Sequence, residues 1–266
     1  MNDDIDGKHG VQSLEIGMSI LRAMVDGQRS MMLKEIAAAA DMPASKAHRY
    51  LVSLIRAGLV EQDPMSSRYD LGPFAMNVGL VALDRLDRVR LGLTAIAEMR
   101  DEINQTTALA VWGDRGPVIV RWERPRRPIT VNVITGTVLD LLTSATGRVF
   151  AAWMPKKTIA PMIADELKNA KLPPELRTKA GVEAMLAEVR SLGFAATRGQ
   201  HKVPGVEAVA APVFNFKNEI SMAVLVVGVQ GMFDTSPDGE VVSSLKRHAA
   251  ALSVRLGAHG EPKTPT

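Results

Sequence analysis

The sequence contains no cysteine among its 266 residues. Disulfide bonds, zinc sites built on thiolates and cysteine nucleophiles are therefore excluded. The absence agrees with a reducing compartment, but exported proteins also lack cysteine in many cases, so it does not identify the compartment by itself.

Long hydrophobic segments are also missing. The first ten residues, MNDDIDGKHG, are acidic and polar and do not contain the apolar core of a secretory signal. The longest apolar run, SMAVLVVGV, is far too short to span a membrane and predicts a buried strand instead. We therefore expect a cytoplasmic protein whose residues 1–10 form a disordered leader.

The motifs of common enzyme classes are absent as well. The chain has no Gly-x-Ser-x-Gly turn, no P-loop and no histidines at metal-ligand spacing. Its histidines are scattered over five positions: His9, His48, His201, His248 and His259. His201 is the one that we place nearest to a pocket, although a position on a surface loop explains it better. The sequence predicts no enzyme, no catalytic residue, no bound metal and no cofactor.

The charge balance is mildly basic, with a formal net charge of +3 and a pI near 9.2. This excess permits nucleic-acid binding without requiring it, so the distribution of the charges is more informative than their sum. The length suits one large domain or two smaller ones, and the 46% hydrophobic and 23% charged content is that of a globular protein.

Three short helices and a hairpin are predicted in residues 11–72. The first helix begins at Ser13, which can cap it, and carries an apolar stripe. The stripe consists of Leu14, Met18, Leu21 and Val25. A second helix ends before Pro43, and a third runs from there to about Ala57, where Gly58 stops it. The strand-like pieces LVEQ and RYDL then flank the turn DPMSS, which completes the order of a winged helix-turn-helix.

The third helix has two different faces at 100° per residue. The side predicted to pack on the first two helices holds Ala47, Leu51, Leu54 and Ile55. The opposite side holds Lys46, Arg49, Ser53 and Arg56, with Ser45 between the two sides and His48 at the boundary. This outer face has no acidic residue and suits phosphates and acceptor atoms in a DNA major groove. A solvated charged face explains the helix alone equally well, but the preceding helix, the tight turn and the hairpin favour DNA binding.

The hairpin and the segment after it supply two further predictions. Arg68 and Tyr69 are candidate contacts to the DNA backbone or minor groove, and an ordinary edge strand explains them equally well. Pro73 opens another helix that runs to about Leu86, and the alternating charges of DRLDRVR continue it. Because a solvated helix of this kind connects domains, residues 73–89 are predicted to form a linker helix.

From about Arg90 the pattern changes to strands and helices that do not alternate strictly. The predicted strands are ALAVW, VIVRWE, ITVNVI, FAATR, VEAVAAPVFN and SMAVLVVGV, with a hairpin turn at NFKNE. Among the predicted helices, KKTIAPMIADELKNA is expected to be broken at Pro161, and the last one spans about Pro237 to Gly257. The fold class is therefore α+β, with helices on a mostly antiparallel sheet, which argues against a doubly wound nucleotide-binding fold.

Three segments together resemble the IclR family of bacterial transcriptional regulators: VQSLEIGMSILRAMVDG, LKEIAAAADMPASKAHRYLVSLIRAGLVEQDPMSSRYDLGP and EAVAAPVFN. The resemblance implies a winged helix-turn-helix over 11–72, the linker helix over 73–89, a GAF-like effector-binding domain over 90–258 and a tail over 259–266. It also implies a homodimer or a dimer of dimers on a palindromic double-stranded DNA operator, more often repressing than activating. In the family, the residues matching Ser45, Lys46, His48 and Arg49 face the DNA, which assigns His48 to the groove.

LLTSATGRVFAAW resembles the family segment that enters a helix beside the effector pocket. Hydroxyls and the free amides of a helix start favour an anion such as a carboxylate, although N-capping explains any single hydroxyl as well. The candidate residues here are Leu142, Thr143, Ser144, Ala145, Thr146 and Gly147. A late strand has Leu225 and Val227 where family members often carry serines, and Val229 where they carry proline. We therefore expect a small organic acid with an apolar body, either aromatic or longer aliphatic.

Two alternatives remain open. The chain is either a DNA-binding regulator or a small-molecule sensor or enzyme domain whose winged helix contacts protein instead of DNA. The basic cluster RWERPRRP, with Trp112 and Trp122 nearby, is either a second anion or nucleic-acid patch or, as we favour, a solvated hairpin.

Overall fold

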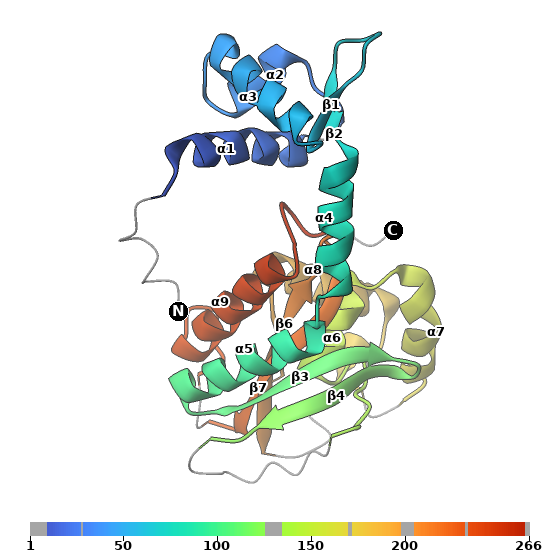
Figure 1. Ribbon diagram of the computed structural model, residues 1–266. Coiled ribbons are helices and arrows are strands. Elements are labelled where there is room, and N and C mark those ends of the chain that lie inside the picture. The colour runs from blue at the N-terminus through green and yellow to red at the C-terminus, as the bar shows by residue number, and fades with distance from the viewer. Residues whose placement is uncertain are drawn as a thin grey trace. The chain divides into compact units, whose positions relative to one another are not determined.

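The computed structural model describes residues 10–27, 29–125, 135–169, 172–197, 205–231 and 234–263. The chain forms two compact units, Met1–Leu86 and Asp87–Thr266 (Figure 1). Several predicted features lie wholly or partly outside the described residues: residues 1–9 of the leader, residues 126–128 of the basic cluster RWERPRRP, the strand ITVNVI, His201, and residues 264–266 of the tail. Each unit has its own hydrophobic core and is described by itself.

The first unit is a winged helix-turn-helix, as predicted. It contains the helices α1 (Gln12–Asp26), α2 (Leu33–Ala39) and α3 (Ala44–Arg56), the antiparallel strands β1 (Val60–Gln62) and β2 (Tyr69–Leu71), and the helix α4 (Pro73–Asp84). The backbone of Met31 exchanges two hydrogen bonds of 2.9 and 2.8 Å with that of Tyr69 and so extends the wing by a bridge. Gly58 has a φ of +73° after α3, and this left-handed conformation ends the helix where the sequence predicted.

The face that α1 buries differs from the predicted one. The buried residues of the helix are Gly17, Ile20, Leu21, Ala23 and Met24. Of the predicted stripe only Leu21 is buried, whereas Leu14, Met18 and Val25 are 65, 43 and 51% exposed. Both sets repeat at helical spacing, so periodicity alone does not decide which of them packs inside. Ser13 is not the cap either, because α1 begins one residue before it without a side-chain cap.

A break separates α4 from the next helix, where one continuous linker helix was predicted. The helix α4 ends at Asp84, and α5 (Arg88–Ile103) begins after Asp87. The Asp87 carboxylate accepts the backbone N–H of Arg90 at 2.9 Å. A side-chain acceptor at this position satisfies a free amide of the first turn, so it starts a new helix instead of continuing the old one.

Five antiparallel strands form the sheet of the second unit, in the order β4-β3-β7-β6-β5. The first hairpin consists of β3 (Thr106–Gly113) and β4 (Gly116–Glu123), and the second of β6 (Val206–Phe214) and β7 (Ile220–Val229). The edge strand β5 (Ala195–Thr197) pairs with β6. This arrangement confirms the antiparallel sheet and the hairpin turn at NFKNE.

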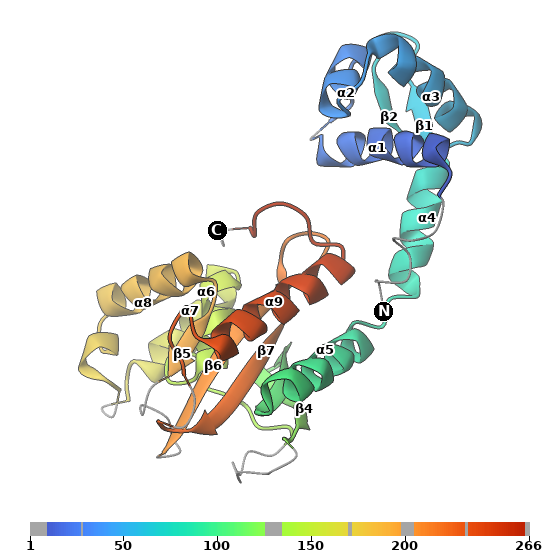
Figure 2. The same ribbon diagram turned by 90° about the vertical axis from the view of Figure 1, so that its left-hand side faces the viewer.

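Helices cover both faces of this sheet. On one face lie α5 and α9 (Glu240–Arg255), which run side by side in Figures 1 and 2. The Thr107 hydroxyl donates to the Ile96 carbonyl of α5 at 2.7 Å and fixes that helix on β3. On the other face, α6 (Ala145–Trp153) and α8 (Lys179–Leu192) share a core with the strand residues Leu225 and Val227. Alternate residues of each strand therefore face different helix pairs.

The predicted break at Pro161 is wrong. The helix α7 (Lys156–Glu166) runs through Pro161, which lies inside it. A proline in a helix removes one backbone hydrogen bond, and here this loss does not end the helix. A short 3-10 turn, η1 (Pro174–Leu176), then leads to α8, whose cap residue Thr178 accepts the N–H of Gly181 at 3.1 Å.

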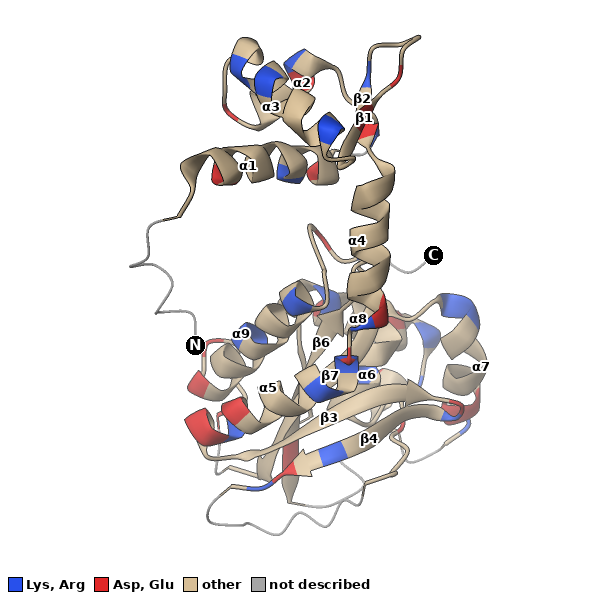
Figure 3. Cartoon of the chain, viewed as in Figure 1, with Lys and Arg blue, Asp and Glu red and all other residues tan. Residues whose placement is uncertain are grey.

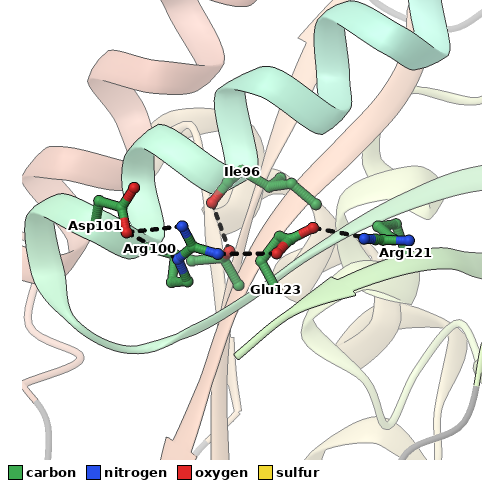
Figure 4. A network of polar contacts seen from close by, with 6 residues as sticks. Ile96, Arg100, Asp101, Arg121 and Glu123 are labelled. Carbon is green, nitrogen blue, oxygen red and sulfur yellow. Dashed lines mark hydrogen bonds and ion pairs between the residues drawn. The ribbon is translucent and has the colours of Figure 1, made fainter. Parts of the chain in front are cut away.

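The basic cluster RWERPRRP is joined to α5 by ion pairs (Figure 4). Arg100 of α5 contacts one oxygen of Glu123 at 2.9 Å, and Arg121 contacts the other at 3.0 Å. Arg100 also pairs with Asp101 at 2.7 Å. Arg121 is therefore part of a network that holds the hairpin to its helix, which favours the solvated-hairpin interpretation for this arginine. Arg126 and Arg127 of the cluster lie outside the described residues.

Candidate nucleic-acid interface and effector site

The helix α3 presents its basic face to solvent. Its inner residues Ala47 and Leu51 are fully buried in the core of the first unit. Six of the predicted DNA contacts are exposed: Ser45, Lys46, His48, Arg49, Ser53 and Arg56. Figure 3 shows basic positions along α3 and no acidic one. The helix thus has a buried apolar side and an exposed basic side, as predicted for these eight residues.

A shallow hollow of about 350 Å³ lies near the start of α3, lined by Ser45, Lys46, Arg49 and Tyr50. An anion there would meet a hydroxyl and two cations, which are common contacts to a phosphate. Ile55 was predicted on the buried face but is 36% exposed. Its exposure follows from its position around the helix axis, since Ile55 lies at the edge of the apolar stripe that Ala47 and Leu51 define.

Arg68 of the wing is held by contacts inside the first unit. Its Nε donates to the Ser30 carbonyl at 2.9 Å, and its Nη2 lies 3.2 Å from a carboxylate oxygen of Glu35. The same carboxylate oxygen accepts the N–H of Met32 at the start of α2. Arg68 therefore ties the wing to α2, and a contact between its side chain and DNA stays a prediction.

Tyr69 requires a correction. Its side chain is 4% exposed and belongs to the core together with Leu51 and Val60. Alternation along a short strand sends neighbouring residues to opposite faces, so Tyr69 points inward. The expectation that this side chain faces DNA is wrong, and its role is to attach the wing to the helices.

The turn of the wing carries negative charge. The Asp63 carboxylate accepts the Ser66 hydroxyl at 2.6 Å and the Met65 N–H at 2.9 Å. These hydrogen bonds, that of Ser66 above all, lower the pKa of Asp63 below its usual value. A carboxylate at this turn repels phosphate, so the exposed cations of α3 are better placed for DNA than the wing is.

The start of α6 uses its hydroxyls inside the protein. The Ser144 Oγ accepts the N–H of Gly147 at 2.8 Å and donates to the Asp140 carbonyl at 2.7 Å. The Thr143 hydroxyl donates to the Asp140 carboxylate at 2.9 Å. A Cβ at Gly147 would lie 1.9 Å from the Asp140 carbonyl oxygen, so a side chain does not fit there. For Ser144, the N-capping explanation therefore holds.

Two backbone N–H groups at this helix start have no hydrogen-bond partner within the described residues. They belong to Ala145 and Thr146, which are 1 and 2% exposed. The preceding amides of Leu141 and Leu142, by contrast, donate to the Glu166 carboxylate at 2.6 and 2.9 Å. Buried N–H groups are nearly always paired, and a helix start favours an anion. The chemistry here is that of two hydrogen-bond donors that suit a carboxylate.

Leu225 and Val227 lie under α6 on the face of the sheet that it covers, and they are 3 and 5% exposed. Leu225 is flanked by Ala108 on β3 and Ala210 on β6, and both neighbours carry only a methyl group. The structure thus brings the two strand residues and the α6 segment to one side of the sheet, as the resemblance implied.

Trp122 is a candidate residue that the sequence did not single out for this site. It pairs with Ala108 across β3 and β4, so it continues the row that contains Leu225. Its indole Nε1 is buried and has no hydrogen-bond partner among the residues that the structure describes. The alternation in VIVRWE indicates on which side of the strand Trp122 lies, but only the strand register places it in this row.

Arg148, the basic residue after Gly147, uses its side chain for hydrogen bonds inside the protein. Arg148 donates to the carbonyls of Leu142 at 2.8 Å and Ala196 at 3.1 Å. Burial lowers its pKa, against the opposing effect of Glu175 and Glu188. These three charged residues line a cavity of about 500 Å³ beside α8, to which none of the eight predicted effector residues contributes.

The described ranges contain no group of three His, Asp or Glu side chains that is arranged to hold a metal ion. They also contain no helix that is long and apolar enough to cross a membrane. Among the histidines, His48 is exposed on α3, and His248 on α9 contacts a carboxylate oxygen of Glu102 at 2.9 Å.

Comparisons with known proteins match both units. Residues 13–64 match the family model described as IclR helix-turn-helix domain, and residues 81–254 match bacterial transcriptional regulator IclR C-terminal. A glycerol operon regulatory protein of Streptomyces griseus is 31% identical over 93% of this chain and 97% of its own. The crystal structure of Pseudomonas aeruginosa HmgR is 38% identical with a TM-score of 0.81, over 94% of this chain and 100% of that one. An IclR homologue of Microbacterium hydrocarbonoxydans, complexed with 4-hydroxybenzoate, has a TM-score of 0.52 at 17% identity, over 93% and 100% of the two chains.

An exposed basic helix in a winged helix-turn-helix, followed on the same chain by an antiparallel α/β domain, is the architecture of a DNA-binding transcriptional regulator. The chain belongs to the IclR family of bacterial transcriptional regulators. The resemblance seen in the sequence is thereby confirmed. Because the matched family and relatives are regulators and not enzymes, the enzyme alternative is set aside.

Proposed function

We propose that this protein is a cytoplasmic, ligand-responsive repressor that binds a palindromic operator as a homodimer, or as a dimer of dimers, and is controlled by a small aromatic acid. The observation that carries the DNA-binding part is the exposed face of α3, which has two cations at its start, a third at its end and no acid. Cations on such a face release counterions from DNA phosphates, which supplies affinity that depends on salt.

Binding to a palindromic fragment from the promoter of this protein's own gene tests the interface. Log affinity decreases as log salt concentration rises. We expect this slope to become shallower by about one unit in Lys46→Ala and in Arg49→Ala, because each variant would lose a phosphate contact. Lys217→Ala is the matched control, since Lys217 is exposed on the β6–β7 turn of the other unit. Unchanged affinity and slope in both α3 variants would refute the assignment.

Exposed apolar side chains support the homodimer. The helix α4 buries none of its residues. Its exposed apolar side chains are Phe74, Met76, Val78, Leu80, Val81 and Leu83, and those of α1 are Leu14, Met18 and Val25. Large apolar patches of this kind mark interaction surfaces. A second copy is the occupant that a two-fold symmetric operator also requires.

The effector assignment rests on three features on one side of the second unit. The backbone N–H groups of Ala145 and Thr146 would donate to the carboxylate, and Leu225 and Val227 would contact an apolar ring. The buried Nε1 of Trp122 would donate to a polar substituent on that ring. The relative complexed with 4-hydroxybenzoate lends support, because that ligand has both a carboxylate and a ring hydroxyl.

Calorimetric titration with 4-hydroxybenzoate, benzoate, glyoxylate and pyruvate tests this assignment. We expect both aromatic acids to bind at least tenfold more tightly than the small polar ones. Trp122→Phe removes the indole N–H donor and also makes the ring smaller. We therefore expect 4-hydroxybenzoate to lose about fivefold to tenfold more affinity than benzoate, which has no ring hydroxyl to accept that hydrogen bond. Tight binding of glyoxylate or pyruvate alone would contradict an aromatic effector, and equal losses for both aromatic acids would leave Trp122 a packing role only.

A further inference from the structure

A second cavity of the effector-binding unit lies at the far end of α6. It has a volume of about 490 Å³, which is within the range of small-molecule sites. Two aromatic residues form one wall, Trp153 at the end of α6 and Phe214 at the end of β6. Their rings meet edge to face with centroids 5.6 Å apart. Such a pair forms an apolar corner against which another ring can pack.

The chain after α9 closes this cavity. Asn218, in the turn between β6 and β7, donates to the His259 carbonyl and accepts the His259 N–H at 3.0 Å. The Asn218 carbonyl also accepts the Lys263 N–H at 3.0 Å. These three hydrogen bonds hold the segment in place, so that Ala258, His259 and Gly260 form a wall of the cavity.

The described lining residues include two cations, Arg190 and Lys246, one histidine, His259, and no Asp or Glu. Arg190 donates through Nη1 to the Ala152 carbonyl at 3.1 Å, which orients its guanidinium. In the part of the chain that the structure describes, neither Arg190 nor Lys246 forms an ion pair with a carboxylate. Glu261 lies in the closing segment and is exposed, but it does not line the cavity. The cavity therefore favours an anion.

This cavity is separate from the candidate effector site. Trp153 ends α6 and Ala145 begins it, and eight residues of rise place these ends roughly 12 Å apart. Along β6, Phe214 is six residues from Ala208, which pairs with Val227, and this spacing is roughly 20 Å. No residue of the predicted effector set lines the cavity.

We propose that this cavity is a second ligand site, which takes a compact aromatic carboxylate. The ring lies against Trp153 and Phe214, and the carboxylate is bound by Arg190 and Lys246. Arginine suits a carboxylate because its planar fork donates two parallel hydrogen bonds, and lysine adds a point charge. The site gives the regulator an input that does not depend on the amides at the start of α6.

Fluorine NMR of the full-length protein labelled with 5-fluorotryptophan tests the proposal, because the chain has three tryptophans. The probe is 2-naphthoate, with 2-naphthylmethanol as its uncharged analogue, and Trp153→Phe and Trp122→Phe assign the resonances. We expect a saturable shift of the Trp153 resonance with 2-naphthoate and none with the alcohol. In Lys246→Gln and in Arg190→Gln the apparent Kd read from Trp153 should rise about tenfold.

Two variants sharpen the test. Lys217→Gln removes a cation that lies over the Phe216 ring outside the lining, so the Kd should stay unchanged. Asn218→Ala releases the closing segment and should weaken binding at Trp153. The proposal is overturned if Trp153 does not respond, if the alcohol binds as well as the acid, or if Lys246→Gln and Arg190→Gln keep the original Kd. A response of Trp122 alone would support the effector site and refute this second one.

Discussion

Arg49 and Arg68 of the DNA-binding unit have different surroundings, so we expect them to have different roles. Arg49 is exposed on α3 and helps to line a hollow that has no acidic residue. Arg68 contacts the Ser30 carbonyl and the Glu35 carboxylate, and its side chain is 38% exposed. A cation without a carboxylate beside it is free for a phosphate, whereas Arg68 already has an internal acceptor and an internal counterion.

Arg68→Ala should therefore change stability and not DNA electrostatics. We expect the free energy of unfolding of the first unit to fall by about 1 kcal/mol, because an exposed ion pair contributes little and the hydrogen bond to Ser30 contributes most. Urea unfolding and the salt slope of operator binding measure the two effects. Arg49→Ala should show the reverse pattern, with stability kept and the slope lowered by about one unit. A lowered slope with full stability in Arg68→Ala would show that the wing contacts phosphate.

At the scale of elements, α4 stands apart from the other helices. It has twelve residues, none of them buried, and before Asp84 it carries no charged side chain. An isolated helix of this composition would expose apolar area that water disfavours by about 25 cal/mol per Å². The same is true of the outer stripe of α1 with Leu14 and Met18. In the proposed homodimer, these two exposed apolar surfaces are the candidates for the interface.

Leu80→Glu tests that surface, because Leu80 is 57% exposed and its substitution removes no contact in the core. A charge at the centre of an apolar interface should convert the dimer to monomer and weaken palindrome binding more than tenfold. Light scattering after size-exclusion chromatography reports the mass. Ser243→Glu, which adds the same charge on an exposed position of α9, should leave the dimer intact. A dimeric Leu80→Glu protein would place the interface elsewhere.

The helices and strands also show which features of the fold could be predicted from local sequence pattern. The order of helices, wing and antiparallel strands follows from periodicity, turn residues and the glycine after α3, and it was predicted. The buried side of α1 was predicted wrongly. The helix has two apolar stripes at helical spacing, and only the tertiary packing determines which of them is buried. The break after α4 was missed because the charges of DRLDRVR suit a solvated helix, while the capping bond of Asp87 depends on backbone geometry.

At the scale of the whole molecule, the second unit depends on the packing of α5 beside α9. Glu102 of α5 accepts hydrogen bonds from Arg247 and His248 of α9. The Arg247 hydrogen bond, against the opposing effect of burial, lowers the pKa of Glu102 from its usual 4.5 to about 2. A carboxylate with a lowered pKa in the folded state stabilises the fold above pH 4.5, and this contribution is lost as the pH falls from 4.5 towards 2.

Glu102→Gln should accordingly cost stability at neutral pH and little in acid. We expect a loss of about 1 kcal/mol or less at pH 6.5, since the Glu102 side chain is 38% exposed and solvent screens the pair. The difference from the wild type should fall to about half or less of its neutral value by pH 3 and approach zero only near pH 2. Urea unfolding of the second unit across this range measures it. A difference that stays constant with pH would mean that the carboxylate charge is not involved.

The candidate effector site was foreseen in part. The α6 segment and the two late-strand residues came from the family resemblance, and the structure places them on one side of the sheet. Trp122 was not foreseen, because its place beside Leu225 follows from the register of β4, β3 and β7, and register is not visible in a single strand. The free amides of Ala145 and Thr146 have no side-chain signature at all, since any residue supplies an N–H.

The alanines beside Leu225 have a consequence for how ligand preference changes in evolution. Ala108 and Ala210 flank Leu225 on the neighbouring strands, and Ala208 flanks Val227. All three alanines are buried in the core that the sheet shares with α6 and α8, so a branched side chain at any of them would change the packing between the sheet and these helices. The amides that would hold the acid belong to the backbone and are untouched by such substitutions. If the proposed effector site is correct, substitutions at these alanines would change the surface that contacts the ring of the acid, while the backbone amides that bind its carboxylate would stay the same.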